Sequence, residues 1–589
     1  MHNIVADALA PFAAIRQSPI VMLSPLVANI ILYVAISELK ARRRAFRVKK
    51  EHGSAALSKL KDFSGLKHAE RSNNILLSAN IALSIDHHST GINLNAFVVG
   101  GPGSGKTRGF IKPNILNLAD SRRGYGANMV ITDPKSNILS SVGKYLKKRG
   151  YTIKVINLSD IAKSDYYNPF SYMRIEKDED RAQIISLIDV IIKSTNSTAD
   201  GKSGSTGDAF WTNSEKMLLQ ALFFYVLEAE PPERRSLVTI ISMLDETTIG
   251  QETESKMQAK FRELAARRPD SLAVSFWKQV SASNVETMRS TLAMANARFS
   301  LFKSVQSLFS KDSLELEKLD NRKTAIFVTT SPANSSLNFI ATMFYTQLFQ
   351  QVDYIATQFN AVGAGAIEPS LKIPLLLMLD EFANLPKIPN FLEMLAYARS
   401  LNMGIIPIFQ STVQAQHMYE KDWETIVDAC DTFLYLGGAK SNFTTEYVAK
   451  FLGKETIDMH TYSNSYDKGK RISQNVQVLA RDLMTADEVG RLPKKDSILR
   501  VGSINPIITP KYNLTSHPKY KFLADANAAD PSAVYIHDVP ERNIKEVYVV
   551  NFSLDDASGE NHAHDKDEEM VEGLDSYMAA ASYNANDWQ

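Results

Sequence analysis

The sequence predicts an α/β protein in which a central, mostly parallel sheet carries an all-helical insertion and an apolar segment precedes both. Short apolar runs alternate with helix-like segments, as in parallel sheets that are covered by helices. This alternation stops between about residues 175 and 318, where helix-like segments follow one another. At the amino end, an uncharged run at 20–36 precedes a dense basic cluster.

The predicted strands are short apolar runs, several of them bounded by Gly, Pro or polar residues. They lie at 95–99, 129–132, 153–157, 324–329, 374–379, 404–409 and 432–436. In the helical region, 215–227 carries apolar residues at helical spacing, and a Gly/Ser-rich loop occupies 200–207. An all-helical insertion inside an α/β domain explains this order most simply.

Composition limits the class of protein. A chain of 589 residues with 44% hydrophobic and 22% charged residues can form several globular units. Its 66 Lys and Arg against 65 Asp and Glu give a net charge of +1, so the overall charge does not indicate nucleic-acid binding. The single cysteine, Cys430, excludes a disulfide framework and argues against a Cys-based metal site, which suits a reducing cytosol.

The amino end predicts a membrane anchor. The run 20–36 is close to the minimum length for a spanning helix. The basic cluster after it would stay in the cytoplasm and attract anionic headgroups, whereas a signal peptide carries its charges before the apolar run. An amphipathic or core helix is the alternative. The apolar stretch 4–15 leaves open whether the chain has one span or two.

A phosphate-binding loop follows the predicted strand 95–99. Its G-x-x-x-x-G-K-[ST] pattern is Gly100, Gly101, Pro102, Gly103, Ser104, Gly105, Lys106 and Thr107. The glycines let successive N–H groups face the phosphates, Lys106 supplies a charge to the β- and γ-phosphates, and the Thr107 hydroxyl binds Mg²⁺. A helix from about Arg108 would direct its positive dipole end at the anion. The loop therefore predicts a site for ATP with Mg²⁺.

Polar residues after two other strands complete the predicted site. Asp380 is expected to hold Mg²⁺ through water, and Glu381 to act as general base. Gln410 is expected to sense the γ-phosphate or orient water. Arg399 is a candidate arginine finger that would reach a neighbouring subunit's nucleotide. The plainer alternatives are that Asp380 and Glu381 form a solvated acidic turn, that Gln410 is a polar residue at the end of a strand, and that Arg399 is a surface arginine.

Six further stretches stand in the order of one protein family. They are 52–55 (His-Gly-Ser-Ala), 132–136 (Thr-Asp-Pro-Lys-Ser), 167–170 (Tyr-Asn-Pro-Phe), 210–211 (Phe-Trp), 379–386 (Leu-Asp-Glu-Phe-Ala-Asn-Leu-Pro) and 481–489 together with 492–493 (Leu-Pro). Over about 51–520 the chain resembles the TraG/TraD-type coupling proteins of type IV secretion, which are related to FtsK/HerA motors. Ser136 departs from the glycine usual in the family.

The resemblance implies a RecA-like motor with an inserted all-α domain, forming a homohexameric ring on the inner membrane of a bacterium. It implies that ATP hydrolysis hands relaxase-bound, single-stranded DNA, or sometimes a protein, from the relaxosome to the secretion channel. Grip on the DNA would be sequence-independent and made by basic residues. Candidates for that grip are Lys112, Arg122, Arg123 and Lys440.

The expected domain division follows from these elements. Residues 1–50 form the membrane anchor and its basic flank, and 51–174 the first part of the nucleotide-binding domain. Residues 175–318 form the inserted all-α domain, and 319–554 the second part of the nucleotide-binding domain. The acidic segment 555–589 has the composition of a disordered tail. Two other functions remain open: an FtsK/HerA-like translocase, and a nucleotide-switched receptor that docks cargo without pumping.

Overall fold

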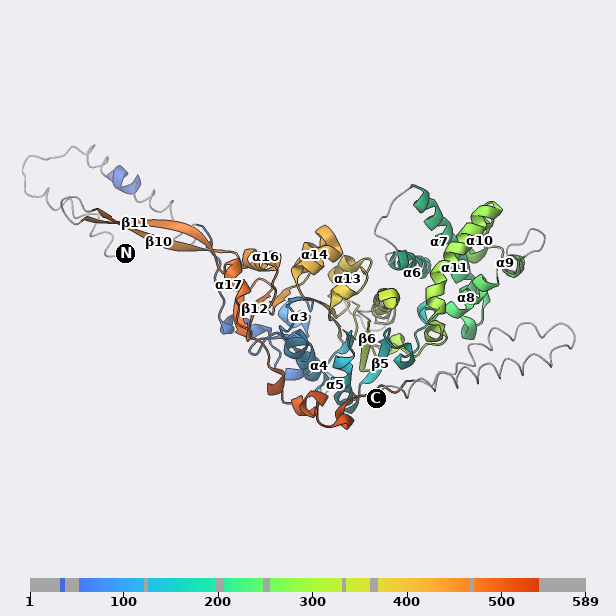
Figure 1. Cartoon of the computed structure of the whole chain (residues 1–589), viewed down its shortest axis with the longest axis horizontal. Helices are drawn as coiled ribbons and strands as arrows, with labels where there is room; N and C mark the ends of the chain where they lie inside the picture. The colour runs from blue at the N-terminus through green and yellow to red at the C-terminus, as the bar shows by residue number, and fades with distance from the viewer. Residues whose placement is uncertain are drawn as a thin grey trace, which may run out of the picture. The chain divides into compact units, whose positions relative to one another are not determined.

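The structure is a computed structural model that describes residues 32–37, 52–120, 126–196, 206–246, 255–330, 335–360, 369–465 and 471–539. Several predicted features lie mainly or wholly outside these ranges: the run 20–36, the basic cluster, Arg122 and Arg123, the loop 200–207 and the acidic tail. Within the described ranges, no helix has the length and apolar character needed to cross a bilayer. The chain divides into two compact units, which are treated separately below (Figure 1).

Nine strands form one hydrogen-bonded sheet in the order β13-β12-β9-β3-β8-β7-β4-β6-β5. β3 pairs in parallel with β8 and β9, β7 with β8, and β5 with β6, whereas β12 is antiparallel to β9 and β13. The predicted, mostly parallel α/β sheet is therefore confirmed. The strands are β3 (Ala96–Val99), β4 (Asn128–Thr132), β5 (Thr152–Asn157), β6 (Thr324–Thr329), β7 (Leu375–Leu379), β8 (Met403–Phe409), β9 (Thr432–Tyr435), β12 (Asp496–Val501) and β13 (Ile507–Pro510).

Burial explains which strands the sequence revealed. β3, β4, β6, β7, β8 and β9 are buried at every position, so they appear as continuous apolar runs. β13 alternates between buried and exposed positions and lies at the edge of the sheet, which is why no apolar run marks it. Two smaller antiparallel pairs were also not predicted: β1 (Asn74–Leu76) with β2 (Ala82–Ser84), and β10 (Lys454–Ser465) with β11 (Arg471–Asp482).

The first unit comprises residues 1–130, 372–383 and 390–533. Aromatic rings hold Phe382 in place: its ring lies 5.6 Å from that of Phe409 and 4.8 Å from that of Phe391. Its helices are α3 (His87–Thr90), the π-helix η4 (Lys106–Ile111), α4 (Lys112–Ala119), α13 (Phe391–Ala398), α14 (Thr412–Tyr419), α15 (Trp423–Asp428), α16 (Asn442–Leu452) and α17 (Ala486–Gly490).

The family stretch 52–55 pairs with the start of β10 in the same unit. Ala55 N donates to Lys454 O at 3.0 Å, and the Thr456 hydroxyl both accepts from His52 N at 3.0 Å and donates to Gly53 O at 2.9 Å. A Cβ on Gly53 would lie 2.2 Å from Lys454 O, so only glycine fits there. The stretch is therefore attached to the start of β10.

The second unit comprises residues 131–371, 384–389 and 534–589. Its described residues between 175 and 318 contain helices and no strand, and α6 to α11 group together in Figure 1. A buried ion pair joins two of these helices, with Arg298 Nε 2.6 Å from Glu215 Oε1. The domain limits at 175 and 318 stay a prediction. The helices are α5 (Asn137–Lys148), α6 (Asp178–Asn196), α7 (Thr206–Ala229), α8 (Leu237–Asp245), α9 (Lys256–Arg267), α10 (Leu272–Ser281), α11 (Val285–Lys303) and α12 (Asn338–Tyr354).

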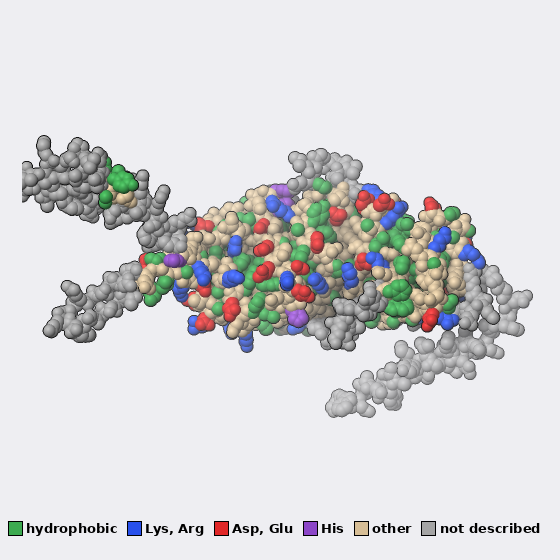
Figure 2. All heavy atoms as spheres, turned by 90° about the horizontal axis from the view of Figure 1, so that it is seen from above, with side chains coloured by type: hydrophobic (Ala, Val, Ile, Leu, Met, Phe, Trp, Pro, Cys, Tyr) green, Lys and Arg blue, Asp and Glu red, His purple; other side chains and the backbone are tan. Residues whose placement is uncertain are grey.

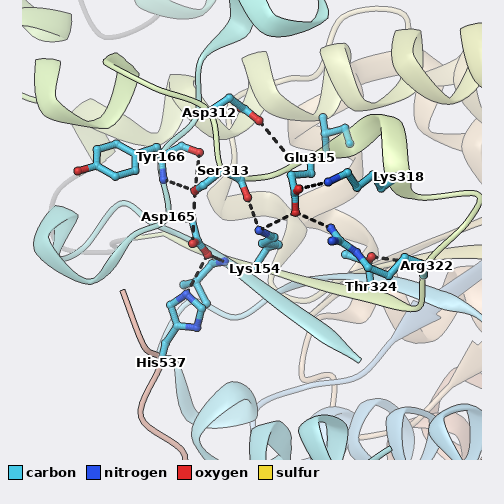
Figure 3. A network of polar contacts seen from close by, with 12 residues as sticks. Lys154, Asp165, Tyr166, Asp312, Ser313, Glu315, Lys318, Arg322, Thr324 and His537 are labelled. Atoms are coloured by element: carbon cyan, nitrogen blue, oxygen red, sulfur yellow. Dashed lines mark hydrogen bonds and ion pairs between the residues drawn. The ribbon is translucent and has the colours of Figure 1, made fainter. Parts of the chain in front are cut away.

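Charged side chains of both signs are interspersed on the face drawn in Figure 2, in keeping with the nearly neutral composition. In the second unit many of them are paired. Figure 3 shows Glu315 between Lys154, Lys318 and Arg322, and hydrogen bonds from Lys318 and Arg322 lower the pKa of Glu315 to about 2. In the same network His537 Nε2 lies 2.8 Å from Asp165 Oδ2, which attaches residues near 537 to the loop after β5.

The departure at Ser136 lies in a helix-capping turn of the second unit. The Asp133 carboxylate accepts from Ile138 N at 2.9 Å and from Leu139 N at 2.8 Å, so it caps the start of α5. Ser136 has a φ of 52°, a left-handed conformation that favours glycine. Its hydroxyl lies 3.1 Å from the Thr329 hydroxyl, a hydrogen bond that offsets part of the cost.

We expect Ser136→Gly to be more stable than Ser136→Ala by about 1 kcal/mol. Both variants lose the hydrogen bond to Thr329, and only alanine keeps a Cβ in the left-handed conformation. Urea denaturation, followed by circular dichroism, measures the difference between the two midpoints. Equal midpoints would mean that the backbone of this turn carries no strain in solution.

Candidate nucleotide site

Three neighbouring strands of the first unit bring the predicted site residues to one edge of the sheet. Val99 of β3 pairs with Phe409 of β8, and Leu379 of β7 pairs with Pro407 of β8. Because these strands are parallel, the residues that follow them emerge at the same edge. Gly100, Gln410 and the Asp380–Glu381 pair therefore lie at the carboxyl ends of adjacent strands.

The backbone of the phosphate loop is held by the strands on both sides. Gly100 N donates to Phe409 O at 3.0 Å, and Gly101 N donates to Gly437 O at 2.9 Å. A Cβ on Gly101 would lie 1.9 Å from Gly438 O, so the loop requires glycine at this position. The close approach of two backbones fixes the start of the loop.

The middle of the loop is open. Gly103 and Gly105 have φ of 70° and 95°, and a Cβ on either would meet nothing within 4 Å. The Ser104 hydroxyl is buried and finds no hydrogen-bond partner among the described residues. Such a cradle of left-handed glycines with free space beside it fits the phosphates of a nucleotide.

Lys106 lies at the first position of the helix that follows. The helix begins two residues before the expected Arg108, as the π-helix η4, because Gly105 supplies its left-handed cap. Lys106 Nζ donates to Gly100 O at 2.6 Å and to Gly101 O at 3.3 Å. Burial lowers the pKa of Lys106, while the nearby Asp380 and Glu381 carboxylates oppose that shift.

Thr107 and Asp380, the two residues predicted to hold Mg²⁺, lie close together, with Thr107 Oγ1 3.4 Å from Asp380 Oδ2. Asp380 is only 6% exposed, and this burial raises its pKa to about 6 against the attraction of Lys106. Among the described residues, no group of three His, Cys, Asp or Glu side chains could hold a metal. One carboxylate, one hydroxyl and the phosphates of a nucleotide are a normal ligand set for Mg²⁺.

Glu381 and Gln410 are half-buried at the same edge. Glu381 has a φ of 50°, and its N–H donates to Asp380 Oδ1 at 3.1 Å. Gln410 N donates to the Gln414 side chain at 2.9 Å, which ties the end of β8 to α14.

Arg399 is not brought to this edge. It is exposed at the carboxyl end of α13, just before β8 begins, which places it at the amino-terminal edge of the parallel strands. β8 has seven residues, about 20 Å of strand, between the two edges. Within one chain Arg399 therefore cannot act on the nucleotide held by the loop.

The structure adds residues that no motif marked. Lys511 Nζ donates to Ser104 O of the loop at 2.9 Å. Asp525 lies 2.7 Å from Lys112 Nζ and 3.2 Å from Arg108 Nη1. Lys112 is 6% exposed, so its suggested role in gripping DNA is wrong, because a buried, ion-paired lysine is not available to a phosphate backbone. Lys440 is exposed.

We expect Asp380→Asn to stabilise the nucleotide-free protein by on the order of 2–3 kcal/mol at pH 8. The folded-state pKa lies above the ordinary value of 3.8, so the stabilising contribution of Asp380 is full below about pH 4 and lost as the pH rises through about 6. The gain should therefore shrink between pH 6 and pH 4. Denaturation midpoints measured from pH 8 to pH 4 give this gain in stability, with the exposed Asp428→Asn as control. A gain independent of pH would contradict the raised pKa of Asp380.

Comparison with known proteins identifies the family. The family described as type IV secretory system conjugative DNA transfer matches residues 79–530. No curated protein matches significantly. Among solved structures, the bacterial conjugative coupling protein TrwBdeltaN70 in its unbound monoclinic form is similar, with a TM-score of 0.54 and 17% identity over 79% of this chain and 95% of that one.

The plasmid coupling protein TrwB in complex with ADP and Mg²⁺ has a TM-score of 0.52 and 16% identity, over 80% of this chain and 96% of that one. The complex with the ATP analogue ADPNP gives the same values. At these identities the likeness concerns the fold, and it supports the predicted RecA-like α/β arrangement. The resemblance drawn from the order of short motifs is confirmed by the family match. This chain belongs to the type IV secretory system conjugative DNA transfer family.

Proposed function

We propose that this protein is a membrane-anchored coupling ATPase that drives relaxase-bound DNA, and in some cases protein, into a type IV secretion or conjugation channel. The observation that carries the proposal is the arrangement of Lys106, Thr107, Asp380 and Glu381 at one sheet edge in a member of the conjugative DNA transfer family. A receptor that only binds nucleotide needs no general base, so the presence of Glu381 favours hydrolysis.

ATP with Mg²⁺ is the proposed cofactor pair, in line with the ADP, Mg²⁺ and ADPNP complexes of TrwB. The loop from Gly100 to Arg108 would hold the phosphates, Lys106 exchanging its bonds to the loop carbonyls for phosphate oxygens. Thr107 and Asp380 would hold Mg²⁺, whose charge neutralises the phosphates. Glu381 would accept the proton of the attacking water, and Gln410 would orient that water.

A homohexameric ring is proposed because Arg399 cannot serve the site of its own chain. An exposed arginine at the far edge of the strands is free to approach the nucleotide of a neighbouring subunit, as arginine fingers do. In such a ring, single-stranded DNA would be gripped along its phosphates without regard to sequence. The exposed Lys440 is the described candidate for that contact.

The anchor and partners complete the proposal. Residues 1–50 would hold the motor on the cytoplasmic face of the bacterial inner membrane, and the pairing of 52–55 with β10 gives the anchor a fixed entry point. Relaxosome proteins and channel components would be the partners. Residues 175–318 would form an all-α domain between the two parts of the nucleotide-binding domain, 51–174 and 319–554. The acidic residues 555–589 would form a tail.

The test compares ATP hydrolysis by the full chain in detergent with and without single-stranded DNA, with Lys106→Ala as control. DNA-stimulated turnover that disappears in the variant is the expected result. Tight ATP binding without turnover at any DNA concentration would favour the nucleotide-switched receptor. Transfer assays in donor cells then separate conjugation from an FtsK/HerA-like role: a Lys106→Ala donor should fail to transfer DNA and still divide normally.

A further inference from the structure

The segment that follows β13 lies against the phosphate loop and the helix after it; residues 511–525 are called the clasp here. Lys511 contacts the loop itself, and a Cβ on Gly109 would lie 3.4 Å from Tyr512 O. Further along, Asp525 pairs with Arg108 and Lys112, which are one turn apart on the helix. A stretch about 400 residues away in sequence thus touches the loop and the first turns of the helix after it.

Lys511 is held in position at both ends. Its backbone N–H donates to Lys495 O at 2.8 Å, which continues the β12–β13 pairing by one residue. Its Nζ donates to Ser104 O at 2.9 Å. Lys511 is half-buried, and burial lowers its pKa while Asp496 opposes the shift. A partly desolvated charge acts more strongly on its neighbours than one in water does.

The rest of the clasp is anchored at several points. Leu514 and Leu523 are 2% and 0% exposed, and Asp525 is fixed by two cations of the helix that carries Lys106. Tyr520 adds a hydrogen bond from its hydroxyl to Asp525 O at 3.2 Å. Lys511 therefore belongs to a fixed element and not to a loose surface loop.

The group that Lys511 contacts belongs to the peptide unit that joins Ser104 to Gly105. In a trans peptide the carbonyl and the N–H point in opposite directions, so a cation on Ser104 O faces away from the Gly105 N–H. Hydrogen bonds in series polarise one another, and a charged donor at the carbonyl makes the N–H at the other end a stronger donor. In a phosphate loop, that N–H is one of those that face the bound phosphates.

We propose that Lys511 is a positioning residue of the nucleotide site. It strengthens phosphate binding by polarising the Ser104–Gly105 peptide through the Ser104 carbonyl and by holding the loop in its binding shape. The inference rests on the proposed function of this loop. Lys106 would touch the phosphates directly, whereas Lys511 acts through the peptide. Its effect is therefore expected on nucleotide affinity, which the peptide serves, and not on the hydrolysis step, which Glu381 serves.

The test measures ADP·Mg²⁺ affinity by calorimetry, and kcat and KM for ATP with DNA present, for the full chain and its variants. Lys511→Met should raise the ADP Kd and the ATP KM together by about tenfold, with kcat within about twofold of wild type. Lys511→Arg should recover affinity to within about threefold, because it restores the charge. Lys511→Gln keeps an N–H donor without charge and should fall between Met and Arg.

The matched control is Lys519→Gln, which removes another clasp lysine, one paired with Asp120 at 3.2 Å and not with the loop. It should leave the Kd and the KM unchanged whatever it does to thermal stability. Lys511→Met binding ADP as tightly as wild type, a loss confined to kcat, or an equal loss in Lys519→Gln would each overturn the proposal while the nucleotide site stands. Wild-type protein that binds no nucleotide would overturn the proposed function and this inference together.

Discussion

Glu381→Gln will reduce ATP hydrolysis by about 10²–10⁴-fold and leave nucleotide affinity within about threefold of wild type. The amide has the size of the carboxylate but cannot accept the proton of the attacking water. Glu381 follows Asp380 at the edge that carries Lys106. Its charge raises the pKa of Lys106, although burial has the larger effect and lowers it. Steady-state hydrolysis with DNA, together with calorimetric binding of ATP·Mg²⁺, separates the two effects.

Glu393→Gln is the control for this experiment, because Glu393 is an exposed carboxylate on α13 of the same unit. It should hydrolyse ATP at the wild-type rate. If Glu381→Gln retains more than about a tenth of the activity, Glu381 is not the general base, and the proposal of a nucleotide-switched receptor gains weight.

Asp525→Asn will destabilise the protein by about 3 kcal/mol, because it leaves the Lys112 ammonium without its buried partner. The Lys112 side chain is 8% exposed and Asp525 13%, so water cannot replace the lost carboxylate. Arg108 loses the same partner but is 59% exposed, and its share of the cost should be small. Chemical denaturation of the nucleotide-free protein gives the change.

Asp482→Asn provides the comparison, since Asp482 pairs with Lys454 at 4.0 Å and both side chains are substantially exposed. That variant should lie within about 0.5 kcal/mol of wild type. Two variants of equal stability would show that Lys112 finds another partner in solution and that the clasp is not fixed by Asp525.

The parts of this protein that the sequence revealed share a physical cause. Strands such as β6 and β7 are covered on both faces, so every residue is apolar or small and the run is visible in the chain. The phosphate loop is equally visible, because glycines at 103 and 105 are needed for left-handed backbone and a lysine must follow them. In each case, one local requirement dictates several consecutive residues.

Lys511 and Asp525 could not be found in this way. Each makes its contact through a single side chain, about 400 residues from its partner, and nothing in its neighbourhood repeats. β13 alternates between buried and exposed positions over four residues, a pattern too short to distinguish from a loop. Arg399 is a different case: it lies just before β8, at the edge away from the phosphate loop, so its predicted role in a neighbouring subunit's site stays a prediction.

The structure shows what two of the family stretches do in the fold. Thr485 and Glu488 form a reciprocal cap at the start of α17, with Glu488 N donating to the Thr485 hydroxyl at 3.3 Å. Asn168 caps a short helix by accepting from Phe170 N at 3.2 Å. These two stretches therefore mark where helices begin.

The pairing of 52–55 with β10 has a mechanical consequence. A pull on the chain before residue 52 would first load three hydrogen bonds: the backbone bond from Ala55 N to Lys454 O and the two bonds of the Thr456 hydroxyl. Because these bonds attach the chain to the start of β10, the strand pair of β10 and β11 would receive that load first.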